Sequence, residues 1–543
     1  VYKRQLYICS VFILGGMTSC EDFLDKREDV GLTEDDIFRD YYSLRGFLDQ
    51  SFNQLENVMV MDNWENGRAF VGLFADEMAT TDNSSAVFTL HSGNWLSNAK
   101  SNKTFEIGNA GSTAISRSYK ALRINNRIIN DIDKAPLTPE QKNEILGQAY
   151  FYRSWFYFQI IKRYGGMPII DKVFEGGDDD IPRMTYHESH DWMMEDIQKA
   201  IYMLPDSWDD PNYGRPTKIA AMALKEWAQL FDASPLMQND LNSTENKGYD
   251  TERAKSAAKS AYEVIRYMDG SKSAPYPYGL ASKEEYTNVF YFKYPPVHQP
   301  EYIWVKRQFP NAANQNQKRT IRTFWQYEDL AFGSGPDGNS MCCPSLNIVN
   351  MFDKKGADGI YYPIDDPRSG YALDYDHKPF EDRDPRFYNN ILLPGTTWGH
   401  YADGRTYYIT TYKGGAAYQH MLTQKDCNKR MFTGFMCKKF MWPECNQYLE
   451  KNNPNCWWDY RFLTIYIRAS QIYLDYAEAL FEGCGSATAT IEGCPISAAE
   501  AINILRRRIG LTDLPSDIVA DPDKFRAAYR RAVSYTHLTL PTT

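Results

Sequence analysis

The chain contains 543 residues, which is enough for three or four domains or for one large helical assembly. Its 39 Tyr and 28 Phe help to bring the aromatic fraction to 15%, and such rings suit stacking on sugars, nucleobases or peptides. The net charge is −10 and no stretch is dense in Lys and Arg, so we expect no nucleic-acid partner.

The first 19 residues have the pattern of a signal peptide. Lys3 and Arg4 precede an apolar run over Leu6–Leu14, which is too short to span a bilayer but suits the core of an export signal. The segment Met17–Cys20 follows and resembles a bacterial lipobox, so we expect Cys20 to be lipid-modified and to begin the mature protein. The acids after it resemble the tag of surface lipoproteins of Bacteroidetes: Glu21, Asp22 and Asp25.

The two extreme ends, residues 1–5 and 534–543, resemble translated sequencing adapter, and we exclude them from the fold assignment. We therefore expect the native start codon and part of the C-terminal sequence to be missing. The folded part is expected over residues 20–533.

The first predicted helix begins after Thr33, a capping residue followed by acids that favour the first turn, and continues at helical spacing to Leu55. From about residue 63 to residue 112 the periodicity is lost, and Asn, Ser, Gly and Thr surround a few large rings. Among these rings, Trp95 lies beside Asn94 in a polar stretch. It either packs the loop onto the helices or stacks on a ligand, so Trp95 and Asn94 are candidate ligand-binding residues.

The central element is predicted within Gly147–Ile170, which carries seven aromatic residues and is apolar on every face. A helix that is apolar all round is a buried helix. Gly165 and Gly166 end it, and Pro168 prevents its resumption. For Arg153, a charge among these rings, we favour a structural ion pair over a ligand contact because buried charges are rarely unpaired.

Helical hairpins surround this element in the predicted fold. One helix is expected over residues 114–132, and a further hairpin over 186–204 and 217–233. Small and apolar residues of the last helix recur 34 residues later, which is the period of tetratricopeptide repeats. The recurring residues are Ala220, Ala223 and Leu230, followed by Ala254, Ala257 and Val264.

Regular structure largely disappears between about residues 271 and 467, where Pro-, Gly- and Asp-rich segments alternate with short aromatic runs. Within this loop-rich region, Arg322, Trp325 and Tyr327 lie together and are further candidates for ligand binding. Helical pattern returns over 469–481 and 497–509. The predicted fold class is mainly α, with a helical core over about 33–270 and 468–530 that encloses a large irregular insertion.

Eight of the ten cysteines lie between Cys342 and Cys494, which suggests disulfides in an exported chain without fixing their connectivity. Pairs close in sequence are candidates, namely Cys427–Cys437, Cys445–Cys456 and Cys484–Cys494. No C-x-x-C motif or cluster of His accompanies them, so we expect no zinc site. We assign no metal-ligating residues and no cofactor, and the sequence leaves open whether a calcium ion is bound.

One long motif and six further spaced motifs, with the lipoprotein-like start, resemble the SusD/RagB family of nutrient-binding surface lipoproteins of Bacteroidetes. The longest match runs from Gly147–Ala149 to Arg163–Pro168. The others are Leu122–Arg127, Pro182–Thr185, Gly214–Ala221, Arg383–Phe387, Tyr473–Leu480 and Asn503–Leu511. The family normally continues beyond the point at which this chain reaches Val533, and we expect that part to be truncated here.

This resemblance implies a core of tetratricopeptide-like hairpins with an irregular subdomain that handles the ligand. It further implies lipid attachment to the outer membrane at the cell surface, and partnership with a SusC-like TonB-dependent transporter barrel. Characterised relatives mostly capture glycans and some capture peptides. The expected function is therefore non-catalytic binding of oligosaccharides for uptake, with peptide as the alternative ligand.

Two other classes of protein fit the sequence less well. A surface glycoside hydrolase needs two carboxylates at a defined separation across a cleft, and the candidate acids lie in a polar loop where turn capping explains them. These acids are Asp374, Asp376, Glu381 and Asp382. A pure tetratricopeptide scaffold would not require a long aromatic loop region. We expect a binding protein and not an enzyme.

Overall fold

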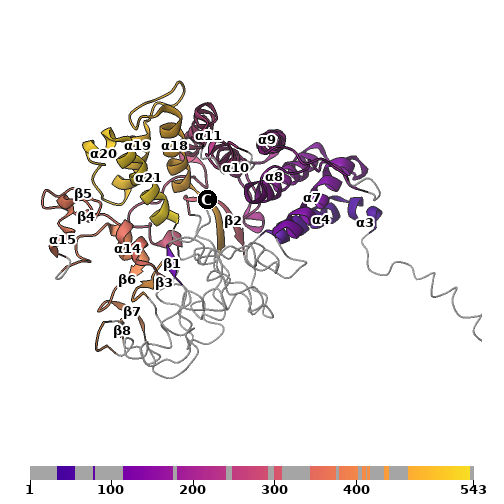
Figure 1. Ribbon diagram of the computed structural model, residues 1–543. Coiled ribbons are helices and arrows are strands. Elements are labelled where there is room, and N and C mark those ends of the chain that lie inside the picture. Colours follow the sequence, from indigo (N-terminus) through magenta and orange to yellow (C-terminus); the bar gives the residue numbers. More distant parts are fainter. Residues whose placement is uncertain are drawn as a thin grey trace, which may run out of the picture.

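A computed structural model gives the architecture of the chain (Figure 1). It describes residues 33–55, 77–79, 114–174, 180–239, 247–290, 299–307, 343–374, 378–400, 406–410, 412–415, 433–439 and 463–537. Helices account for most of the residues in these ranges, so the predicted mainly α class is confirmed. None of the described helices is long and apolar enough to cross a bilayer.

The helical core is a row of antiparallel helices in which each packs on the next (Figure 1). Helix α11 contacts α18, although almost 200 residues separate them in the sequence, so the two ends of the chain form one array. This arrangement is the predicted set of tetratricopeptide-like hairpins. Its helices are α7 (Ala114–Asp131), α8 (Pro139–Tyr164), α9 (Tyr186–Met203), α10 (Lys218–Ala233), α11 (Thr251–Gly270), α18 (Ala469–Cys484), α19 (Ala498–Arg508), α20 (Ser516–Ala520) and α21 (Pro522–His537).

The ends of these helices follow from side-chain capping. The hydroxyls of Thr138 and Thr185 each accept a hydrogen bond from the backbone amide three residues on. In return, their own backbone amides donate to the side-chain oxygens of Gln141 and Glu188, which forms a capping box at the start of α8 and α9. Helix α8 ends at Gly165, whose φ of 77° is strained for residues with a Cβ. The end of α8 at Gly165 and the start of α9 at Tyr186 agree with the sequence-based prediction, whereas α8 begins at Pro139, ahead of the stretch Gly147–Ile170 in which it was predicted.

The N-terminal helix differs from the prediction. A single helix was expected from Thr33 to Leu55, but the chain forms α3 (Glu34–Phe38) and α4 (Tyr41–Gln54). Asp40 interrupts it because this residue is extended, with φ −157°, and its carboxylate accepts a hydrogen bond from the Ser43 amide as the cap of α4.

Helix α8 is buried on every face over most of its length, as predicted. Its rings pack edge-on against aromatic side chains from two other elements, β2 and α10: Phe151 and Trp155 against Trp304, and Phe158 against Trp227 and Phe231. Arg153 forms the predicted structural ion pair, with Nε and Nη2 donating to Asp196 of α9 at 2.6 and 2.8 Å. Its third donor binds Asn126 Oδ1 of α7 at 2.9 Å, so one guanidinium ties three helices together.

A two-stranded antiparallel sheet joins the helical core to the loop-rich region, and the sequence analysis missed it. Strand β2 (Tyr302–Arg307) pairs with β10 (Leu463–Arg468), from Leu463 opposite Arg307 to Arg468 opposite Tyr302. Every residue of β10 is buried. The chain therefore enters residues 308–462 and leaves them through the same sheet, which is fastened to α8 by the Trp304 ring.

The loop-rich region contains four smaller antiparallel sheets, each of two strands, in its described parts. They are β1–β3 (Met78–Ala79 and Cys343–Pro344), β4–β5 (Lys354–Lys355 and Tyr361–Tyr362), β6–β9 (Ile391–Leu392 and Met436–Cys437) and β7–β8 (Thr397–His400 and Thr406–Tyr408). Short helices lie between them: α14 (Leu346–Met351), α15 (Tyr371–Asp374) and α16 (Pro385–Asn390). Single 3₁₀ turns occur at Ile132–Lys134, Asp210–Asn212, Ser271–Ser273, Asn288–Phe290 and Pro367–Ser369.

Buried arginines hold these short elements together. Arg383 Nη2 donates to the carbonyls of Val349 and Phe352 at 2.6 and 2.8 Å, and Arg383 Nη1 donates to the carbonyl of Pro379 at 3.1 Å. Arg506 of α19 reaches Asp353 at 2.9 Å and so ties the region to the helical core. Because loop carbonyls have no partner in regular structure, such side chains satisfy groups that would otherwise be buried unpaired.

The proposed Cys484–Cys494 disulfide is wrong, because both residues are free thiols in the structure. Cys484 is the last residue of α18, and the Cys494 thiol contacts the Tyr476 hydroxyl instead. Cys437 forms no disulfide, so the proposed Cys427–Cys437 pair is wrong as well, whereas Cys445–Cys456 lies outside the described ranges and stays a prediction.

Candidate ligand-binding site

The lipidation residue Cys20 and the five predicted ligand-binding residues all lie outside the described part of the chain. The ligand candidates are Asn94, Trp95, Arg322, Trp325 and Tyr327. The structure nevertheless describes the residues on both sides of the stretches that carry them. Two clusters of these flanking residues, the first anchor and the second anchor, define where each stretch begins and ends.

The first anchor joins Leu55, Arg117 and Lys306. Lys306, near the end of β2, donates from Nζ to the Leu55 carbonyl at 2.8 Å, where α4 has just ended. Burial, together with the smaller effect of the Arg117 guanidinium of α7, lowers the pKa of Lys306 to about 8. The end of α4, the first turn of α7 and the end of β2 therefore lie close together.

The second anchor joins Glu77, β1 and β3. Ala79 pairs with Cys343 and Met78 with Pro344, and the Ser345 amide donates to the Glu77 carbonyl at 2.9 Å. Burial raises the pKa of Glu77 to about 7, against the opposing charge of Lys439. This small sheet holds the end of one stretch and the start of another on adjacent strands.

Three stretches of chain run between the same two anchors. Residues 56–76 leave the first anchor and end at the second, residues 80–113 return, and residues 308–342 begin at Arg307 and end at Cys343. Trp95 lies in the second stretch, and Arg322, Trp325 and Tyr327 lie in the third. The two predicted groups of ligand residues are far apart in sequence, yet their stretches start and finish beside each other.

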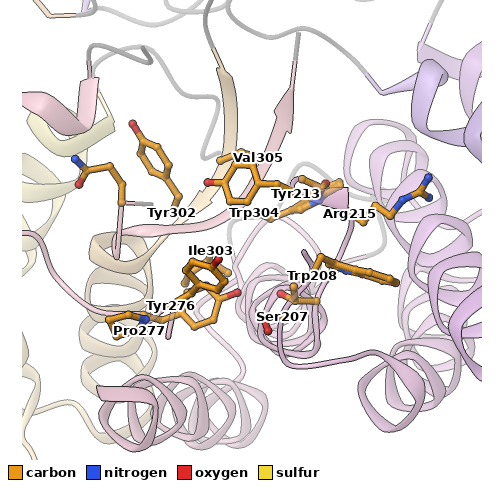
Figure 2. A pocket seen from close by; sticks show the side chains of 14 residues that line it. Ser207, Trp208, Tyr213, Arg215, Tyr276, Pro277, Tyr302, Ile303, Trp304 and Val305 are labelled. Carbon is orange, nitrogen blue, oxygen red and sulfur yellow. Dashed lines mark hydrogen bonds between the residues drawn. The ribbon is translucent and has the colours of Figure 1, made fainter. Parts of the chain in front are cut away.

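An aromatic hollow lies next to β2, between the α9–α10 connection and the segment after α11 (Figure 2). Six of its lining residues are aromatic: Trp208, Tyr213, Tyr276, Tyr278, Tyr302 and Trp304. The indole nitrogens of Trp208 and Trp304 donate to the carbonyls of Pro216 and Gly214 at 2.8 and 3.2 Å. The Tyr302 hydroxyl donates to the Val289 carbonyl at 2.6 Å.

This hollow is too small to be the capture site. Its volume is about 50 Å³, whereas pockets for small molecules measure about 300–1,000 Å³. The polar groups of three of its large rings are already bonded within the protein, so they are not available to a ligand. The hollow therefore serves packing and fixes β2, and with it the start of residues 308–342, against the helical core.

The acids that a hydrolase would require do not gain support from the structure. Glu381 is exposed and forms an ion pair with Lys378 at 3.0 Å, which is the setting of a solvated surface carboxylate. Asp382, next to it, has a φ of 53° and shapes the turn before Arg383. Asp376 and the side chain of Asp374 lie outside the described part of the chain.

Several sequence motifs act as structural ties and not as ligand contacts. Arg183 of the Pro182–Thr185 motif donates to the carbonyls of Tyr164 and Gly166, which fixes the turn after α8. Arg215 pairs with Asp49 at 2.7 Å and binds Gln148 at 3.0 Å. Arg508 pairs with the buried Glu301 at 2.8 Å. Each of these motifs joins elements that are distant in sequence.

A helical array of tetratricopeptide-like hairpins carrying a large irregular insertion defines the structural class, and comparison with known families agrees with it. The SusD-like_3 family model, described as starch-binding and associating with the outer membrane, matches residues 22–226. The SusD_RagB model, described as the SusD family, matches residues 300–533. The chain belongs to the SusD/RagB family.

Solved structures show the same fold at low sequence identity. A SusD-like protein from Bacteroides fragilis is 22% identical with a TM-score of 0.65, and the match covers 93% of this chain and 85% of that protein. A SusD-like carbohydrate-binding protein from the same species is 19% identical, with a TM-score of 0.63 and the same coverage. A surface glycan-binding protein A from Bacteroides uniformis is 16% identical, with a TM-score of 0.54 over 90% and 85% of the two chains. No curated protein matches the sequence.

Proposed function

We propose that the chain is a non-catalytic cell-surface protein that binds oligosaccharides and delivers them to a TonB-dependent transporter of the outer membrane. The family description of the N-terminal match, starch-binding and associating with the outer membrane, supports this assignment. Structural relatives described as carbohydrate-binding and glycan-binding agree with it. A lipid on Cys20 would provide the membrane attachment.

The position that we propose for the binding site is argued from the arrangement of the two anchors. Residues 80–113 and 308–342 share both anchors, so Trp95 and Trp325 belong to stretches that are held side by side at each end. We propose that Trp95, Trp325 and Tyr327 form an aromatic platform between the anchors. Asn94 and Arg322 would supply hydrogen bonds at its edge.

Sugar chemistry suits such a platform. The C–H faces of a pyranose ring stack on Trp and Tyr, while its hydroxyls accept and donate hydrogen bonds to amides and guanidinium groups. The rigid part of the molecule is the helical core, and a preorganised support reduces the entropy lost on binding. Peptide is the alternative ligand, because aromatic and amide side chains also bind extended backbone.

Calorimetric titration against a panel of neutral oligosaccharides and peptides, with analysis of the products, tests this function. We expect binding of at least one saccharide with micromolar to millimolar affinity, and no release of shorter sugars. Cleavage of the bound saccharide would favour the glycoside hydrolase. Binding of peptides and of no saccharide would replace the ligand class.

The membrane assignment has separate tests. Mass spectrometry of the protein from native membranes should find a diacylated Cys20, because two acyl chains give stable anchoring where one gives marginal binding. Co-purification from the same membranes should recover a barrel transporter. An unmodified Cys20 would overturn the anchor, and recovery of the protein alone would overturn the partnership.

A further inference from the structure

A second pocket lies on α7 and the segment that follows α8. Its volume is about 380 Å³, which falls within the range of about 300–1,000 Å³ for small-molecule sites. Two of its lining side chains are cationic, two are aromatic and three are apolar. They are Arg123 and Lys172, Tyr119 and Phe174, and Pro168, Ile170 and Ile181.

The spacing of the lining residues in the sequence explains why they face the same pocket from two elements. Tyr119 and Arg123 are four residues apart on α7, so both project from one face of the helix. On the other wall, the lining residues from Pro168 to Phe174 are every second residue, which is the spacing at which an extended chain presents side chains to one side. The pocket therefore lies between one face of α7 and one side of the segment that follows α8.

A chain of buried hydrogen bonds through Asn126 and Arg153 fixes the two walls of the pocket relative to each other. Asn126 of α7 donates from Nδ2 to the carbonyls of Ile170 and Lys172 at 2.9 and 3.1 Å. Its Oδ1 accepts a hydrogen bond from Arg153, which is paired with Asp196. The orientation of the Asn126 amide is thus fixed from the core, and the pocket wall is preorganised by the helices beneath it.

Among the residues that the structure describes, no carboxylate is paired with the two cations of this pocket. Arg123 and Lys172 are both exposed, and within the described ranges neither is in an ion pair. The described lining contains no carboxylate. Lys172 Nζ lies 5.6 Å from the centroid of the Phe174 ring, which keeps its charge beside an apolar face. Two exposed cations beside aromatic rings are complementary to an anion that also carries an apolar face.

We propose that this pocket is a subsite for a uronic acid residue of an acidic oligosaccharide. The inference rests on the proposed saccharide-binding function and extends it by naming a sugar class. The carboxylate of the uronate would accept hydrogen bonds from Arg123 and Lys172, and its C–H face would lie on Tyr119 or Phe174. Arg123 can bind a carboxylate through two parallel N–H donors, which gives the site geometric selectivity.

Matched ligands and variants test this subsite. The probes are trigalacturonate and its fully methyl-esterified form, which have the same rings but differ in charge, together with an acidic peptide of the same charge. The variants are Arg123→Gln and Lys172→Gln, with Lys272→Gln as the control, because Lys272 is an exposed cation at the end of α11 that pairs with Asp269. Calorimetry at low ionic strength and thermal melting are measured for each protein.

We expect the wild type to bind trigalacturonate at least tenfold more tightly than the ester, a ratio that falls as salt is added. Each pocket variant should weaken binding of the acid by roughly tenfold, the value of one charge-assisted hydrogen bond, and leave binding of the ester unchanged. The control should match the wild type, and all variants should melt alike because the replaced side chains are exposed.

Equal affinity for acid and ester, or unchanged binding in both pocket variants, would overturn the subsite. The acidic peptide binding as tightly as trigalacturonate would also overturn it. Binding of neutral saccharides without any preference for acid would remove the subsite and keep the proposed function. Failure to bind any saccharide would remove both.

Discussion

The helical core and the loop-rich region are stabilised in different ways. In the core, helices α7 to α11 bury continuous apolar faces, and α8 is apolar on every side, so packing area dominates. In the loop-rich region the strands are mostly two residues long, and buried charged side chains provide the contacts. Arg383 donates to backbone carbonyls, and Arg386 forms an ion pair with the buried Asp384. The first region has a pattern that can be read from sequence, and the second depends on individual side chains.

This difference suits a protein whose core supports and whose loops contact a ligand. Periodic packing makes a rigid array but leaves little freedom to vary its surface. Loops that are fixed at a few points by buried arginines can carry different side chains between those points. The two anchors are such points, since they fix the described residues that flank 80–113 and 308–342.

The largest expected effect comes from removing a buried charge pair in the middle of the helical core, Arg153 with Asp196. Arg153→Met would leave Asp196 buried with only Lys199, at 3.7 Å, as a cation nearby. We expect the free energy of unfolding to fall by roughly 3–5 kcal/mol, the usual result of breaking a buried pair from one side. Denaturant unfolding followed by circular dichroism measures it.

The matched control is Arg39→Met, which removes an exposed pair with Asp40 at 3.4 Å. Its effect should be about 0–1 kcal/mol, as for surface ion pairs in general. If Arg153→Met is no more destabilising than Arg39→Met, the chain of hydrogen bonds through Arg153 does not hold the helices together.

A smaller effect is expected in the loop-rich region. Arg383→Met removes the donor shared by the Val349, Phe352 and Pro379 carbonyls, and also removes a charge whose pKa is lowered by its burial. Since the lost hydrogen bonds are partly offset by the lost desolvation penalty, we expect destabilisation of about 2–3 kcal/mol. Proteolysis should then cut the loop-rich region first.

Protection of the helical core in that experiment sharpens the comparison, because it shows that the two regions lose structure separately. A loss of helical signal together with the loops would contradict separate stabilisation. No change in proteolysis would show that Arg383 is not needed for the order of the loop-rich region.

The pH dependence of stability provides a third prediction. Burial between α10 and α18 raises the pKa of Glu226 well above its usual value, an effect that the neighbouring Asp475 adds to, and burial raises the pKa of Asp475 to about 8. The folded state therefore binds protons more tightly than the unfolded state. Stability from this pair is complete below the ordinary carboxyl pKa and is lost as pH rises towards 8.

We expect the denaturation midpoint of the wild type to decrease between pH 5 and pH 8, and Asp475→Asn to reduce that decrease. Asp517→Asn is the control, because Asp517 is partly exposed and its pKa is lowered by Arg368, so it titrates below this window. Equal pH profiles for the wild type and Asp475→Asn would show that the buried pair does not control stability.

The sequence predicted the helical core well because its signals are local. Apolar residues and the glycines at its end located α8, helical pattern located α9, and the burial argument for Arg153 correctly indicated an ion pair. The break at Asp40 was missed because apolar spacing continued through it and concealed the second cap. Local pattern alone does not decide between one helix and two helices that share a face.

The sheet between β2 and β10 was missed for a different reason. Both strands are short and buried on both faces, so neither shows alternation, and their pairing joins residues about 160 apart in sequence. The β-branched and aromatic residues of Tyr302–Arg307 and Leu463–Arg468 were the available signal. The anchors depend on such distant pairings, and no single-sequence pattern specifies which stretches they bring together. The residues proposed for ligand binding stay predictions.

The central claim is that Trp95 and Trp325 act on one ligand although they lie on separate stretches. The most direct measurement is a double-mutant cycle in calorimetry, with Trp95→Ala, Trp325→Ala and the double variant titrated with the best-binding oligosaccharide. We predict that each single variant lowers affinity, that the effects of the two are not additive, and that melting temperatures change little. Unchanged affinity in both single variants, or losses that add as for independent sites, would contradict the account.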